Sequence, residues 1–172
     1  TLYGANAVAG VVDLKTNMTT KNQLDTTVGS NNQRKMSFKK LWENWSIGVS
    51  VDQSDGISTY PQGTEKDGYD IQSFNVGYAD EGHELLAVRT NQVSDLDASG
   101  ADDTDYTSDS QFTFLQYKNT QIDNVDIIVD TTLWDREYVN GTEVDTYDSQ
   151  TYHGKVVHNY NTDSINNKEG VD

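Results

Sequence analysis

The sequence contains no cysteine, a single proline and few basic residues. The absence of cysteine excludes a disulfide scaffold, a thiolate metal site and cysteine catalysis. The formal net charge of −16 argues against nucleic acid as a partner, because the phosphates would repel the chain. The only proline is Pro61, so long stretches are free to pair as strands.

Long apolar runs and helical periodicity are also missing. No run approaches the roughly 18 apolar residues that a membrane-spanning helix needs. Apolar residues hardly ever recur at the spacing of a helix face. Aromatic residues nevertheless make up 10% of the chain, and ten residues are tyrosine. Because disordered acidic chains are usually poor in aromatic residues, we expect an ordered chain built from strands.

Apolar and polar residues alternate in several segments. In residues 124–134 one side carries Val125, Ile127, Val129, Thr131 and Leu133. The other side is mostly Asn, Asp and Thr, interrupted by Ile128 and Trp134. This period of two predicts half-exposed strands. Together with β-branched and aromatic content, it predicts eight strands near 23–30, 34–41, 45–54, 69–79, 83–94, 109–118, 124–138 and 148–160.

The predicted connections are of two kinds. Tight turns such as 80–82 alternate with long loops at 55–68, 95–108 and 139–147. An up-and-down meander that crosses a bilayer has tight turns on one rim and long loops on the other. Most predicted strands reach the roughly 9–11 residues of a membrane strand, whereas strands of soluble sheets have about 5–6. Alternation alone does not separate a barrel from a soluble sandwich, but strand length and loop asymmetry favour the barrel.

The predicted fold is therefore all-β. We expect an antiparallel up-and-down meander that forms part of a large transmembrane β-barrel, incomplete and with about eight strands. The long loops would form part of the extracellular mouth.

Aromatic residues gather near the ends of the predicted strands. They suit the girdle that marks the two membrane interfaces of a barrel, and the alternative is ordinary core or hairpin packing. The residues concerned are Trp45, Tyr60, Tyr69, Tyr78, Trp134, Tyr138 and Tyr147.

One loop, DLDASGADDTDYTSD, is rich in aspartate. Ca²⁺ takes 6–8 oxygen ligands and often takes them from flexible acidic loops, so this loop has the chemistry of a calcium site. It does not match the EF-hand pattern. The alternative is a solvated outer loop whose charges keep the surface soluble. The candidate ligands are Asp95, Asp97, Asp102, Asp103 and Asp105.

No pattern of a catalytic site is present. The sequence has no nucleophile elbow, phosphate-binding loop or dinucleotide fingerprint. His83, His153 and His158 are scattered and have no cysteine partners, which argues against zinc. We therefore expect a protein that is not an enzyme and requires no cofactor, with Ca²⁺ in the acidic loop as the one candidate.

The opening stretch, TLYGANAVAGVVDLKTN, carries a spaced pattern of small residues that runs into a short strand. Glycines in such a place allow the backbone to approach its neighbours closely. The stretch resembles the segment of TonB-dependent outer-membrane receptors in which the plug domain ends and the barrel begins. Asp13 stands where that family usually has Asn. The matching residues are Tyr3, Gly4, Ala7, Gly10, Val11, Val12, Leu14 and Thr16.

The resemblance implies that residues 1–17 are the end of a plug and residues 18–172 the N-terminal part of the barrel. The chain would then be a fragment holding roughly the first eight of about 22 strands. The stretches RTNQVSD and DGYDIQ are similar to cobalamin-receptor-like members of the family.

The function that the resemblance implies is the import of a small-molecule ligand across the outer membrane of a Gram-negative cell. Such a receptor binds a metal chelate or cofactor, either a siderophore or cobalamin, at its outer loops. It imports the ligand when TonB, driven by the proton gradient of the inner membrane, pulls on the plug. The partners would be TonB, the small-molecule ligand and outer-membrane lipid.

Two alternatives come from other classes of protein. A passive porin-type barrel would have similar strands without the plug-to-barrel junction. A soluble, calcium-binding extracellular β-domain, similar to an adhesin module, would fold alone and would become more stable with Ca²⁺.

Overall fold

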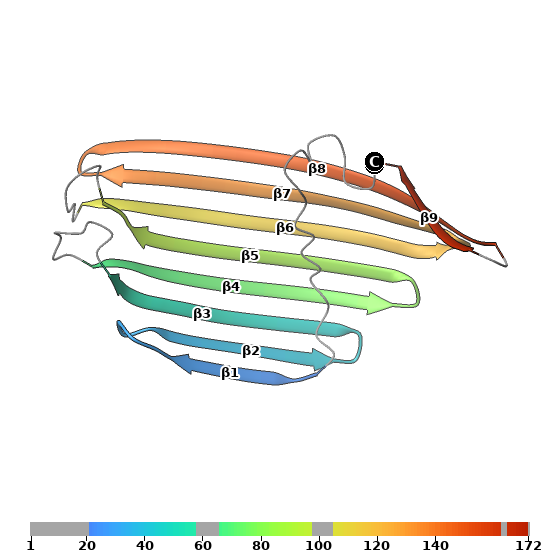
Figure 1. Ribbon diagram of the computed structural model, residues 1–172, viewed down its shortest axis with the longest axis horizontal. Helices are drawn as coiled ribbons and strands as arrows, with labels where there is room; N and C mark the ends of the chain where they lie inside the picture. Colours follow the sequence, from blue (N-terminus) through green and yellow to red (C-terminus); the bar gives the residue numbers. More distant parts are fainter. Residues whose placement is uncertain (1–20, 58–65, 98–104, 163–164, 172) are drawn as a thin grey trace.

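The computed structural model describes residues 21–57, 66–97, 105–162 and 165–171, with side chains described as far as residue 159. These residues form one open antiparallel sheet of nine strands, in which every strand pairs with its neighbours in sequence (Figure 1). The strands are β1 Gln23–Val28, β2 Arg34–Trp42, β3 Trp45–Ile57, β4 Asp67–Asp80, β5 His83–Asp95, β6 Tyr106–Ile122, β7 Val125–Asn140, β8 Glu143–Thr162 and β9 Ile165–Val171.

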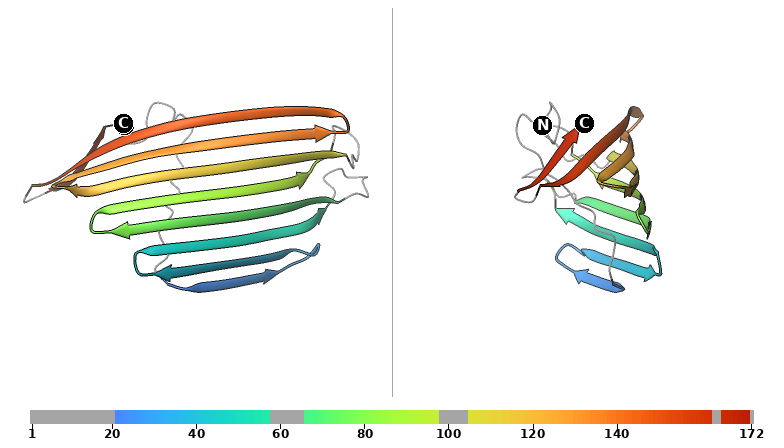
Figure 2. Two further views of the ribbon diagram at one scale, coloured as in Figure 1. Left: turned by 180° about the vertical axis from the view of Figure 1, so that it is seen from behind. Right: turned by 90° about the vertical axis from the view of Figure 1, so that its right-hand side faces the viewer.

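The predicted all-β, antiparallel up-and-down meander is confirmed. The sheet is twisted and does not close, so it has the form of part of a barrel (Figure 2). No helix of the length and hydropathy that would cross a membrane occurs among the described residues.

The connections lie at two opposite ends of the strands (Figure 1). At one end, which we call the turn rim, two-residue turns join β2 to β3, β4 to β5 and β6 to β7. The opposite end, the loop rim, has the connections 29–33, 58–66 and 96–105. The predicted asymmetry is thus present for the first seven strands.

The predicted loop 139–147 is wrong. Strand β7 continues to Asn140 and β8 begins at Glu143, so only Gly141 and Thr142 connect them. Gly141 takes a φ of 58°, which glycine adopts without a steric penalty, and this conformation permits a tight turn. The loops predicted at 55–68 and 95–108 are also shorter, because β3, β4 and β6 extend into them. The ninth strand, Ile165–Val171, was not predicted because its sequence INNKEGV is mostly polar and does not alternate.

Side chains alternate between two faces of the sheet, and directly paired residues share a face. We call face A the side that carries Trp45 and Val49, and face B the side that carries Ser46 and Ser50. Near the turn rim, face A has an apolar band, which Lys40 interrupts on β2. The register aligns its members across seven strands: Phe38, Trp42, Trp45, Ile47, Val49, Val51, Phe74, Val76, Tyr78, Leu85, Ala87, Leu115, Tyr117, Ile127, Val129, Tyr152 and Val156.

Nothing in the described residues covers this band. Val157 is the only buried hydrophobic residue among them, and it lies on face B. Trp42 and Tyr152 are 70% and 74% exposed. A single layer of sheet has no apolar core of its own, so the apolar band must meet another apolar medium or partner.

Face B is more polar than the band on face A, and side-chain contacts between paired charged residues cross it. Lys35 bonds to Asp52 at 3.4 Å, Lys118 to Glu84 at 3.0 Å, and the ring nitrogen of His153 lies 3.1 Å from Asp130. Each of these pairs is directly opposite in the register. Opposite charges at such positions stabilise strand pairing modestly. Apolar pairs lie on the same face, among them Val88 with Phe114.

Glycine is required at the turn between β4 and β5. Gly82 has a φ of 102°, and a Cβ there would lie 2.6 Å from Cγ of Gln121. We expect Gly82→Ala to lower the free energy of unfolding by about 1–3 kcal/mol, because it combines an unfavourable φ with a steric clash. Gly154→Ala is the matched control, since a Cβ there has no neighbour within 4 Å. Denaturant unfolding of the two variants under the same conditions checks the prediction, and equal stabilities would contradict it.

Candidate functional site

A polar hollow of about 650 Å³ lies at the loop rim, where β2, β3, β4 and β5 end. Its lining has cationic, anionic and amide side chains, and Val93 is the one aliphatic side chain in it. The residues are Asn32, Arg34, Gln53, Ser54, Asp55, Lys66, Gly68, Tyr69, Asp70, Val93 and Asp95. We refer to it as the rim hollow.

A β-bulge in β3 shapes one wall of the rim hollow. The pairing of β3 with β4 shifts between Ser54 and Ile57, which leaves Asp55 and Gly56 without regular partners. Gly56 has a φ of +68°, and a Cβ there would lie 1.8 Å from the carbonyl oxygen of Asp67. Only glycine fits this position, and the bulge turns the end of β3 toward the β1–β2 connection.

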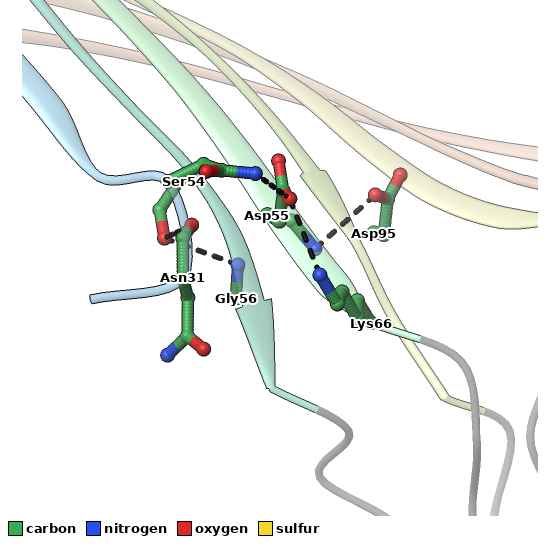
Figure 3. A network of polar contacts seen from close by, with 8 residues as sticks. Asn31, Ser54, Asp55, Gly56, Lys66 and Asp95 are labelled. Carbon is green, nitrogen blue, oxygen red and sulfur yellow. Dashed lines mark hydrogen bonds and ion pairs between the residues drawn. The ribbon is translucent and has the colours of Figure 1, made fainter.

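The bulge is tied to that connection by hydrogen bonds (Figure 3). The backbone N–H of Asp55 donates to the carbonyl oxygen of Asn31 at 2.9 Å. The hydroxyl of Ser54 donates to the same oxygen at 3.1 Å, and the N–H of Gly56 donates to the Ser54 hydroxyl at 3.0 Å. Asn31 itself has a φ of 55°, a conformation that asparagine tolerates better than most residues.

Asp55 is the centre of the polar contacts. Its Oδ2 accepts from Nδ2 of Asn32 at 2.6 Å and from Nζ of Lys66 at 3.2 Å. The hydrogen bonds from Asn32 and Lys66, together with the positive charges of Lys66 and Arg34, lower the pKa of Asp55 below its ordinary value of 3.8. The carboxylate is thus held in its charged form at the opening of the hollow.

A second set of contacts holds the start of β4, which forms another part of the lining of the rim hollow. Tyr69 donates its hydroxyl to Oδ1 of Asp52 at 3.3 Å and accepts from Nε2 of Gln33 at 3.1 Å. The N–H of Gly68 donates to Oδ2 of Asp95 at 3.2 Å (Figure 3). The arrangement provides charged and amide groups for a polar ligand, and nothing in it resembles a nucleophile with its base.

The candidate calcium ligands do not form a cluster in the described part of the chain. Asp95 accepts from Gly68 and faces the rim hollow, and Asp97 and Asp105 follow and precede the 98–104 segment. No group of three or more Asp, Glu, His or Cys side chains suited to a metal occurs among the described residues. Asp102 and Asp103 lie outside them, so calcium binding stays a prediction.

The residues that carry the plug-to-barrel resemblance also lie outside the described residues. They include the six positions Tyr3, Gly4, Ala7, Gly10, Val12 and Thr16.

The predicted aromatic girdle divides into two groups. Trp45 and Tyr78 pack on face A with ring centroids 4.8 Å apart, and Tyr117 contacts His83 on the same face and rim. The Tyr78 hydroxyl donates to Asp80 at 2.7 Å, so the ring is apolar and its tip polar, as in interfacial aromatic residues.

The other girdle candidates do not belong to this group. Tyr69, Trp134, Tyr138 and Tyr147 lie on face B, away from the apolar band, because each occupies the opposite parity along its strand. Tyr60 lies outside the described residues.

The rim hollow itself was not expected from the sequence. It depends on which residues of β2, β3, β4 and β5 come together at the rim, and that depends on register and on the bulge. The one local signal is Ser-Asp-Gly at 54–56, because a glycine inside a strand often marks a bulge.

Comparisons with known proteins give no relative for this chain. No family model matches it, and searches of curated proteins and of solved structures found no match.

The hydrogen bonds and ion pair of Asp55 predict how its pKa responds to substitution of a partner. Its pKa is lower in the folded protein than in the unfolded chain, so its contacts stabilise the fold above pH 3.8 and lose this effect as the pH falls through the folded pKa. We expect Lys66→Met to raise the pKa of Asp55 toward 3.8 without restoring it fully, because the bond from Asn32, the larger cause, remains.

An NMR titration of the carboxyl carbons, assigned with Asp55→Asn, measures this shift. Lys35→Met is the matched control, because Lys35 pairs with Asp52 instead. A pKa of Asp55 that is the same in the Lys66→Met variant and the unchanged protein would contradict the prediction.

Proposed function

We propose that this chain forms part of the wall of a TonB-dependent outer-membrane transporter, which binds a metal chelate or cobalamin and imports it. The observation that carries the proposal is the apolar band on face A, which belongs to a single-layered meander and is not covered by any described part of the chain. The plug-to-barrel resemblance of residues 3–16 supports the choice of family.

Lipid is the partner that fits the band best. On β7 the face A positions from Val125 to Leu133 extend roughly 27 Å along the strand at about 3.4 Å per residue. With the usual strand tilt this is roughly 20 Å, somewhat less than the roughly 25 Å apolar height of outer-membrane barrels.

The band ends where face A becomes acidic. Toward the loop rim, Asp109 lies directly opposite Glu137, and Asp135 lies directly opposite Asp148. Like charges at paired positions repel one another, and water screens them far better than lipid does. In the proposed arrangement these residues stand outside the bilayer, so the strands rise beyond it on the side of the loops.

Face B suits the interior of a wide barrel. Large barrels have a polar, wet interior, and face B carries serines, glycines and paired charges beside a few apolar pairs such as Val88 and Phe114. The rim hollow lies on the other face, because Gln53, Asp70 and Val93 of its lining share face A by register, so it would stand beyond the bilayer on the outer side of the wall.

The membrane part of the proposal predicts a difference between two adjacent positions. Val49 is in the apolar band and Ser50 is on face B. We expect Val49→Arg to destabilise the protein in lipid vesicles by about 2–4 kcal/mol, the cost of a cation facing the middle of the bilayer. Ser50→Arg should cost much less, since its side chain meets a polar interior. Equal effects of the two substitutions would argue against a lipid-facing face A.

Transport is tested in cells that carry the complete gene. We expect uptake of radiolabelled cobalamin or of one of a panel of ferric chelates to depend on the gene. Uptake should stop when an uncoupler collapses the proton gradient or when TonB is deleted. Uptake that survives both treatments would indicate a passive porin instead. A stable, monomeric protein that needs no detergent would indicate the soluble β-domain.

A further inference from the structure

Five large side chains gather on face B close to the loop rim. They come from three adjacent strands, and we call them the Arg136 cluster: Tyr106 from β6, Trp134, Arg136 and Tyr138 from β7, and Tyr147 from β8. The register places Arg136 directly opposite Tyr147 on one side and Ser110 on the other. The cluster is separate from the rim hollow, which is formed by β2 to β5.

Arg136 is held by aromatic rings. Its guanidinium carbon lies 4.6 Å from the ring centroid of Trp134 and 5.5 Å from that of Tyr138. Its Nη1 donates to the Tyr138 hydroxyl at 2.8 Å. A guanidinium group at these distances from ring centroids is attracted by the negative faces of the rings, so its position is fixed.

The tyrosines extend this platform across the neighbouring strands. The Tyr138 ring meets the Tyr147 ring edge-on at a centroid distance of 5.9 Å, and the Tyr106 ring at 6.2 Å. Ser108 and Ser110, which pair with Tyr138 and Arg136, are only 8% and 9% exposed. These small residues leave room for the larger side chains to lie over the sheet.

The charge of Arg136 is not neutralised by a carboxylate, as the charges of two lysines on face B are. Lys35 and Lys118 each face a carboxylate directly across the strands. Arg136 forms no ion pair within the described part of the chain, and its Nε is buried without a hydrogen-bond acceptor there. A fixed guanidinium with spare donors, surrounded by aromatic rings, is a ready receptor for a carboxylate group.

We propose that the Arg136 cluster binds a planar aromatic carboxylate, or the part of a larger ligand that has this chemistry. The carboxylate takes Nη2 of Arg136, since Nη1 bonds to Tyr138 and Nε is buried, and the ring stacks on the tyrosines, which favour offset or edge-on contacts. This inference rests on the proposed function for its setting, since it is the barrel interior near the mouth that would bring a ligand to face B.

The experiment measures binding of three probes to the purified protein in detergent by isothermal titration calorimetry. Benzoate has the ring and the charge, benzamide has the ring alone, and acetate has the charge alone. We expect benzoate to bind at least about tenfold more tightly than either of the others, as a charge-assisted hydrogen bond contributes that much.

Substitutions at Arg136 test the assignment of the site. Arg136→Gln should weaken benzoate binding by about tenfold or more, and Arg136→Lys should give an intermediate affinity, because it keeps the charge and loses the planar fork. Arg89→Gln is the matched control, since Arg89 lies on face A and bonds to Gln111. Its affinity for benzoate should be unchanged.

Two results would overturn the inference. One is equal affinity for benzoate and benzamide. The other is an Arg136→Lys variant, folded by circular dichroism, that binds benzoate as tightly as the unchanged protein. Neither result bears on the membrane test with Val49 and Ser50, so failure of this site and failure of the proposed function are distinguishable.

Discussion

The constraint on which the whole structure depends is that a single antiparallel sheet has two faces and no interior. Backbone hydrogen bonds hold the nine strands together, but each side chain must meet whatever medium lies on its own face. Face A has an apolar band that no described part of the chain covers, and face B has paired charges. Such a sheet is stable only where its two faces meet different surroundings, and a membrane barrel provides that difference.

The second feature that organises the molecule is the change in chemistry along the strands. Near the turn rim, Trp45 and Tyr78 border the apolar band, whereas the same face near the loop rim carries Asp109, Glu137 and Asp135. The polar sites also lie toward the loops: the rim hollow around Asp55 and the Arg136 cluster. Both candidate binding sites therefore lie at a different height along the strands from the apolar band. In the proposed arrangement the sheet can contact lipid at one height and a ligand at another.

The sequence was sufficient for the fold and insufficient for the sites. Alternation in residues 124–134 predicted β7 and placed Trp134 on the polar side, because period two is a local property. The loop at 139–147 was wrong because one glycine conformation at Gly141 allows a turn of two residues. The rim hollow and the Arg136 cluster each join residues from three or more strands, so they depend on register, which single-strand patterns do not specify.

The central claim is that face A meets lipid. Spin labels placed one at a time at positions 47 to 52 of β3, in protein reconstituted into vesicles, test it most directly through their accessibility to oxygen and to a water-soluble nickel chelate. The account predicts a period of two: high oxygen accessibility at Ile47, Val49 and Val51, and low oxygen accessibility at positions 48, 50 and 52. Uniform accessibility to the nickel chelate along the strand would contradict it, because both faces would then meet water.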